Sequence, residues 1–130
     1  MRRLLLFTFV AVVLMLGIRP QPAQAVIVSF PEMVCESIKA NHLRKFKKIT
    51  KVYRLKVIHF YKDSACEGVG LVRYALTHNS QQVGVYIVRQ LPTKALKQIG
   101  TDGLTLSEWI VQHGLQETPI ASSIRAQLSK

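Results

Sequence analysis

Acidic residues are scarce in this chain, and one long segment has none. The 130 residues include 18 Lys and Arg but only seven Asp and Glu, which gives a formal net charge of +11. No acidic residue lies between Glu36 and Asp63. This scarcity argues against a carboxylate-rich metal site, and the excess of positive charge favours anionic partners such as nucleic acid, anionic lipid or an acidic protein.

The motifs of common catalytic and cofactor sites are also missing. The chain has no G-x-S-x-G, no glycine-rich phosphate loop and no calcium loop. None of its histidines has a His, Cys, Asp or Glu neighbour at a zinc-binding spacing; they are His42, His59, His78 and His113. Asp63 and Glu67 are better explained as turn residues than as an acid–base pair. The sequence therefore predicts no catalytic residue, no metal and no cofactor, and it leaves open whether any catalysis remains.

Long apolar runs are absent after residue 18. Arg2 and Arg3 precede an uncharged, mostly apolar stretch from Leu4 to Ile18, and Ala23-Gln24-Ala25 has the small residues that a signal peptidase requires. We expect residues 1–25 to be a secretory signal peptide, followed by one small basic domain over residues 26–130. An uncleaved N-terminal anchor is the alternative.

Cleavage after Ala25 would release a periplasmic or secreted protein. It would remove three arginines and no acidic residue, so the net charge would fall from +11 to +8. We expect no stable membrane insertion of the remaining chain, because no second apolar run of that length follows. The chain has no glycosylation acceptor and no large cysteine framework, which favours a bacterial envelope.

Cysteine is limited to Cys35 and Cys66. An exported protein meets an oxidising compartment, and two cysteines allow a single intramolecular pairing. We therefore expect a Cys35–Cys66 disulfide, which would stabilise the fold by about 3–4 kcal/mol in the chain-entropy model.

Hydrophobic periodicity predicts a helix followed by strands. A capping box at Ser29 and Glu32 begins an apolar stripe that predicts a helix over 31–47. Residues rich in Val, Ile, Tyr and Phe then predict three strands, at 49–62, 69–78 and 83–90. A second capping box and a Thr-Pro pair predict helices at 105–114 and 118–128, and a helical turn is expected at 93–98. The expected fold is α+β: a single small domain with an antiparallel sheet of three or more strands, or a partial OB-like barrel, between an N-terminal helix and C-terminal helices.

The acid-free segment is the main functional candidate. Basic side chains bind phosphates by releasing counterions, and aromatic side chains interleaved with them can stack on unpaired bases. The candidate anion-binding residues are Arg44, Lys45, Lys47, Lys48, Lys51, Arg54 and Lys56. The interleaved aromatic residues are Tyr53, Phe60 and Tyr61. A solvated face without a partner is an equal alternative, and a membrane-surface role for the first helix is a third.

Two patches resemble the staphylococcal-nuclease-like (thermonuclease) family. One is Tyr53-Arg-Leu-Lys-Val-Ile58, and the other combines Gln82-Val-Gly-Val-Tyr-Ile-Val88 with the segment 102–115. The resemblance implies a small oligonucleotide-binding barrel in which Arg54 contacts phosphate. The positions of the family's metal-binding aspartate and general-base glutamate are occupied by His59 and Lys62. A site without those carboxylates cannot hold calcium or activate water.

Three functions are therefore consistent with the sequence. The first is an exported domain that binds nucleic acid or another polyanion without catalysis. The second is a nuclease-like phosphodiesterase with Arg54 and Arg73 on phosphate. The third is a structural or interaction module that binds a protein of the cell envelope.

Overall fold

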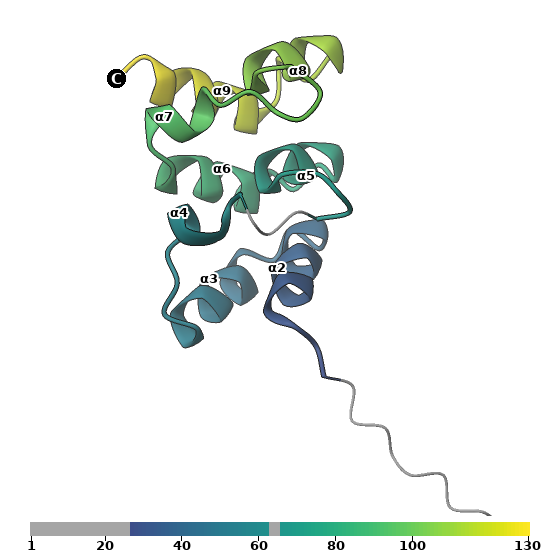
Figure 1. Cartoon of the computed structure of the whole chain (residues 1–130), viewed down its shortest axis with the longest axis vertical. Coiled ribbons are helices and arrows are strands. Elements are labelled where there is room, and N and C mark those ends of the chain that lie inside the picture. Colours follow the sequence, from purple (N-terminus) through teal and green to yellow (C-terminus); the bar gives the residue numbers. More distant parts are fainter. Residues whose placement is uncertain (1–26, 63–65) are drawn as a thin grey trace, which may run out of the picture.

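The computed structural model describes residues 27–62 and 66–130, and these residues form helices joined by short turns. The helices are α2 (Phe30–Lys39), α3 (Leu43–Val52), α4 (Val57–Phe60), α5 (Leu71–Thr77), α6 (Gln81–Gln90), α7 (Thr93–Leu96), α8 (Leu106–Gln112) and α9 (Pro119–Leu128). Within these residues, β pairing is limited to two isolated bridges, Cys66 with Val69 and Ile99 with Thr105. In Figure 1, α2 and α3 form one end of the molecule, α5 and α6 the middle, and α7 to α9 the other end.

The predicted α+β fold is wrong for the described residues, because they contain no sheet and no barrel. The segment expected as a strand at 49–62 is the end of α3, a turn and α4, and the strands expected at 69–78 and 83–90 are α5 and α6. Leu71 to Leu76 is a short apolar run that suits a buried strand or a buried helix equally. The packing of α5 and α6 against other helices decides the outcome. The nuclease-like resemblance loses its expected barrel with this correction.

The helix predicted over 31–47 is in fact two helices. Asn41 adopts the left-handed conformation, with φ of 50°, and ends α2. The N–H of His42 donates to the carbonyl of Ser37, and that of Asn41 to the carbonyl of Ile38, which is the Schellman pattern. His42 then begins α3, since its Nδ1 accepts from the N–H of Lys45 at 3.1 Å.

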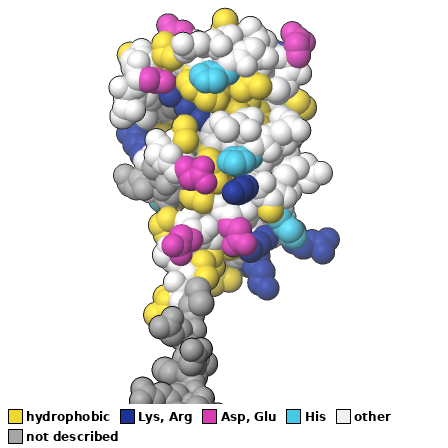
Figure 2. All heavy atoms as spheres, turned by 90° about the vertical axis from the view of Figure 1, so that its right-hand side faces the viewer, with side chains coloured by type: hydrophobic (Ala, Val, Ile, Leu, Met, Phe, Trp, Pro, Cys, Tyr) yellow, Lys and Arg dark blue, Asp and Glu magenta, His cyan; other side chains and the backbone are white. Residues whose placement is uncertain are grey.

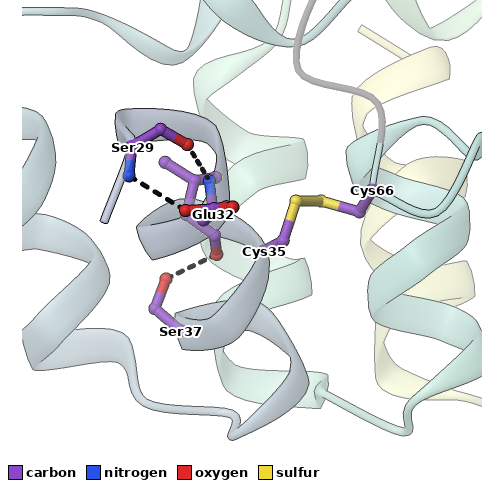
Figure 3. The surroundings of a disulfide bond; sticks show 6 residues. Ser29, Glu32, Cys35, Ser37 and Cys66 are labelled. Carbon is purple, nitrogen blue, oxygen red and sulfur yellow. Dashed lines mark hydrogen bonds between the residues drawn. A yellow bond between two sulfur atoms is a disulfide. The ribbon is translucent and has the colours of Figure 1, made fainter. Parts of the chain in front are cut away.

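Several predicted helix ends are confirmed. Ser29 and Glu32 form a reciprocal capping box at the start of α2 (Figure 3), and Thr105 and Glu108 form another at the start of α8. Thr118 accepts from the N–H of Ala121 at the start of α9. A helical turn, α7, lies within the predicted segment 93–98. These signals are local hydrogen bonds, so they can be recognised without knowing the tertiary fold.

The turns of two helical hairpins pack against each other. The α5–α6 turn repeats the α2–α3 turn: Asn79 has φ of 54°, and the N–H of Ser80 donates to the carbonyl of Ala75. The buried hydroxyl of Ser80 donates to the carbonyl of Ile38, across the two turns. The side-chain oxygen of Asn41 accepts from the N–H groups of Gln82 and Val83, at 3.1 and 3.2 Å. Asn41 therefore caps α6, a helix of the other hairpin.

The core is continuous through the middle of the molecule. Buried apolar side chains of α2, α3, α5, α6 and α9 form one cluster, with Phe46, Ile38, Leu71, Ile87 and Ile120 among its largest members. Gly84 of α6 faces α9, where a Cβ would lie 2.3 Å from Cδ1 of the buried Ile120. A side chain at this position would therefore force the two helices apart.

The predicted disulfide is confirmed. Cys35 of α2 is bonded to Cys66, with the two Cα atoms 5.5 Å apart (Figure 3). Cys66 is buried and pairs with Val69 just before α5. The bond thus fixes the start of the second hairpin against the first, closing a loop with a sequence separation of 31.

Replacement of Asn41 by Gly tests the cap between the two hairpins. Glycine keeps the left-handed turn but leaves the N–H groups of Gln82 and Val83 without their side-chain acceptor, so Asn41→Gly should lower the free energy of unfolding by about 1–2 kcal/mol. Urea denaturation measures this change. Asn79→Gly is the matched control, because Asn79 has the same backbone conformation and its side chain accepts from the Gln81 side chain. Equal losses in the two variants would contradict the assigned cap.

Candidate anion-binding surface

The basic residues of α3 lie on one face of the helix. The lysines at 47, 48 and 51 follow Arg44 by three, four and seven residues. Because an α-helix has about 3.6 residues per turn, this spacing places all four side chains on one side of the helix. All four are exposed. Phe46 and Ile49 are buried on the opposite side. The strand predicted from Ile49 onward would have separated these cations, whereas the helix gathers them into a basic face, defined here as Arg44, Lys47, Lys48 and Lys51.

Two lysines of α3 have specific neighbours. Lys45 is half-buried, and its Nζ lies 3.4 Å from a carboxylate oxygen of Glu36 on α2. That ion pair neutralises Lys45 locally, so Lys45 contributes less than its neighbours to the positive potential. Nζ of Lys47 lies 4.9 Å from the centre of the Tyr86 ring, which orients this amine while leaving it exposed.

Arg54 and Lys56 extend the positive charge beyond the end of α3. Arg54 has φ of 53°, and its N–H donates to the carbonyl of Lys51 in the turn that ends α3. Lys56 precedes α4, and its N–H donates to Nδ1 of His59 at 3.2 Å. Both side chains are exposed. In Figure 2, Lys and Arg side chains project from the lower edge of one face of the molecule, at the level of α2 and α3 in Figure 1.

The interleaved aromatic residues are mainly structural. Phe60 is buried, with its ring 5.2 Å from that of Phe30 and 6.4 Å from that of Phe46. The hydroxyl of Tyr61 donates to Oε1 of Gln98 at 3.1 Å. Tyr53 is partly exposed, and its ring lies 4.9 Å from that of Phe30. Of the three aromatic residues, Tyr53 is the one with a substantially exposed ring, so the segment is a poor platform for stacking on successive bases.

Arg73 lies outside the basic face and is engaged by its own fold. Its guanidinium donates to Oδ2 of Asp102 at 2.7 Å and to the carbonyl of Leu104 at 2.9 Å, and it lies 5.5 Å from the Trp109 ring. These contacts hold the loop between α7 and α8 against α5. Arg73 also borders a cavity of about 420 Å³ between α5 and α7, with Leu71, Leu91 and Leu96 in its wall.

Hydrogen bonding lowers the pKa of Asp102. The N–H of Leu104 and, next, the guanidinium of Arg73 stabilise the carboxylate and lower the pKa of Asp102 below its ordinary value of 3.8. The pKa of Glu108 is lowered in the same way by the backbone and hydroxyl of Thr105 in the capping box. Both groups favour the folded state while they are ionised.

The chain matches the model of the family described as "Protein of unknown function (DUF3718)" over residues 34–98. The match covers half of the chain. The chain belongs to this family. The matched region includes Cys35 and Cys66, most of the α2–α3 hairpin, the whole α5–α6 hairpin and every candidate anion-binding residue. No curated protein and no solved structure matches the chain.

Within the described parts of the chain, no group of three His, Cys, Asp or Glu side chains is arranged to hold a metal ion. In the same residues, no helix has both the length and the apolar character needed to cross a bilayer.

The periodicity of the cations at 44, 47, 48 and 51 was available in the sequence and indicates the basic face once a helix is assumed. The exposure of Val52 and Ile58 had no such signal, because both belong to the run that predicted a strand at 49–62.

Acid titration tests the role of Asp102. Since its folded pKa lies below its unfolded pKa, its stabilising effect is present above the unfolded value and is lost as pH falls through the folded value. We expect the unfolding temperature to decrease below about pH 4, and to decrease less steeply in Asp102→Asn. Thermal unfolding followed by circular dichroism measures both slopes. Glu117→Gln, which removes an equal charge outside this cluster, should keep the steeper slope; a shallower slope there too would refute the assignment.

Proposed function

We propose that this protein is an exported domain that binds an anionic partner, nucleic acid or another polyanion, through the basic face of α3, with Arg54 and Lys56 extending the contact. The observation that carries the proposal is the spacing of Arg44, Lys47, Lys48 and Lys51 on one exposed helix face that has no carboxylate. The nearest acidic partner, Glu36, is paired with Lys45 at the flank of that face.

The electrostatics of α3 support this proposal. Four like charges within two turns of a helix repel one another and destabilise the helix. A phosphate-bearing partner would neutralise these charges and remove the repulsion. Each phosphate that a Lys or Arg side chain neutralises releases counterions, so binding should weaken steeply as salt increases. Catalysis is not part of the proposal. Of the two arginines in the phosphodiesterase alternative, Arg73 is engaged by Asp102 and the carbonyl of Leu104, which disfavours a phosphate contact at that residue.

The proposed location is the periplasm or the exterior of the cell. The Cys35–Cys66 disulfide is compatible with an oxidising compartment, and therefore with the prediction that residues 1–25 are a secretory signal peptide.

A salt series tests the proposal. The protein as exported, with its N-terminus identified by mass spectrometry, is titrated with a labelled single-stranded oligonucleotide as a generic polyanion. Substitution of Arg44, Lys47, Lys48 and Lys51 by Gln should weaken binding at low salt by at least about tenfold. The slope of log affinity against log salt should shrink by about 3, since each single-strand phosphate contributes roughly 0.7.

The matched control removes the same charge away from α3, at the end of α6 and beyond it. Arg89, Lys94, Lys97 and Lys130 are exposed and lie at the end of α6, on α7, just after α7 and at the C-terminus. Their substitution by Gln should leave most of the affinity and slope intact. If both quadruple variants lose affinity equally, net charge rather than the α3 face governs binding. Shortening of the probe would contradict binding without catalysis.

A further inference from the structure

Exposed apolar side chains lie among the cations at the end of α3 and on α4, the helix that follows it. Val52 is 67% exposed, Tyr53 46% and Ile58 38%. They alternate along the chain with Lys51, Arg54 and Lys56, which are also exposed. We define the tip as Val52, Tyr53 and Ile58. Single exposed aliphatic side chains are common on protein surfaces. These, however, lie within a strongly basic segment and give it two properties, positive charge and apolar contact area.

The N-terminal lead-in reaches the same end of the molecule. Phe30, the first residue of α2, lies against Tyr53, with 4.9 Å between the ring centres. Ile27 and Val28, just before it, are exposed. Figure 1 shows the chain entering the helices at this end, at the start of α2. Two stretches that are distant in the sequence therefore bring exposed aliphatic side chains to one end.

A charged polymer alone does not account for this combination. Nucleic acid would bind the cations through its phosphates and stack its bases on exposed aromatic rings. Here, however, Phe60 is buried and Tyr61 is hydrogen-bonded to Gln98. Val52 and Ile58 gain nothing from a phosphate backbone. An anionic lipid surface offers both matching chemistries, because phosphate groups lie directly above hydrocarbon that accepts aliphatic side chains.

We propose that the anionic partner is a phospholipid surface, on which Val52 and Ile58 enter the headgroup–hydrocarbon boundary while the basic face and Arg54 contact lipid phosphates. This inference rests on the proposed function of the basic face and names its partner class. The protein binds on the bilayer through this end and does not span it. The far end, with α7 to α9, faces away from the lipid.

Vesicle sedimentation tests the inference with two paired variants. The exported protein is mixed with vesicles of phosphatidylcholine alone, or of phosphatidylcholine with phosphatidylglycerol, and separately with the oligonucleotide. Val52→Ser with Ile58→Ser removes the aliphatic groups of the tip. Ile99→Ser with Val111→Ser removes one Ile and one Val at the other end, where they are 68% and 60% exposed. Circular dichroism confirms that each variant is folded.

We expect the native protein to bind the anionic vesicles at least about tenfold more strongly than the phosphatidylcholine vesicles. The tip variant should lose about tenfold in affinity for anionic vesicles and keep its oligonucleotide affinity, while the far-end variant should behave as the native protein.

The outcomes separate the two proposals. Oligonucleotide binding without binding to anionic vesicles, or equal vesicle binding by the tip variant and the native protein, would overturn the lipid inference and leave the basic face standing. Equal binding to both vesicle types would overturn it as well. If the quadruple Gln variant of the basic face binds both probes as tightly as the native protein, the proposed function and the lipid inference fail together.

Discussion

The hydrogen bonds of Asn41 are the constraint on which the arrangement of the helices depends. Its backbone, in the left-handed conformation, ends α2 and turns the chain into α3. Its side-chain oxygen, in turn, accepts from the N–H groups of Gln82 and Val83 and so caps α6. The N-cap residue of α6, Ser80, makes no side-chain cap hydrogen bond of its own, and its hydroxyl donates to the carbonyl of Ile38. The two hairpins thus exchange polar partners. The hydrogen bond of Ser80 is buried, where an unsatisfied group is costly, and those of Asn41 are more exposed; together they fix the relative position of the hairpins.

The functional surface follows from this arrangement. Once α2 and α3 are antiparallel and packed on α5 and α6, the apolar side of α3 is committed to the core through Phe46 and Ile49. The remaining side must face solvent, and the sequence places Arg44, Lys47, Lys48 and Lys51 there. The Cys35–Cys66 bond adds a covalent constraint between the hairpins without involving α3. The core and the disulfide therefore maintain a rigid platform from which the cations and the exposed Val52 and Ile58 project.

Local signals in the sequence were sufficient for the helix ends and for the disulfide, and insufficient for the fold class. The capping boxes at Ser29 and Thr105 involve residues three apart, so they are visible without tertiary information. By contrast, Leu71 to Leu76 is apolar except for Arg73 and shows no clear helical period, and Val83 to Val88 includes several residues that favour strands. These segments are helical because they pack against α2, α3 and α9, which a single-sequence reading does not reveal. The candidate residues of the basic segment could be listed from the sequence, but their gathering on one face depends on a helix that continues to Val52, where a strand was expected from Ile49.

The most direct test of the central claim is a map of the contact surface by amide chemical shifts. Isotopically labelled protein, with its disulfide intact, is titrated with the oligonucleotide and then with small anionic lipid bicelles. We expect the amides of α3 and of residues 53–58 to shift with both ligands, and those of α7, α8 and α9 not to shift. The amides of Val52 and Ile58 should respond more strongly to the bicelles. Shifts centred on α8 and α9, or spread evenly over the molecule, would contradict a binding surface on α3.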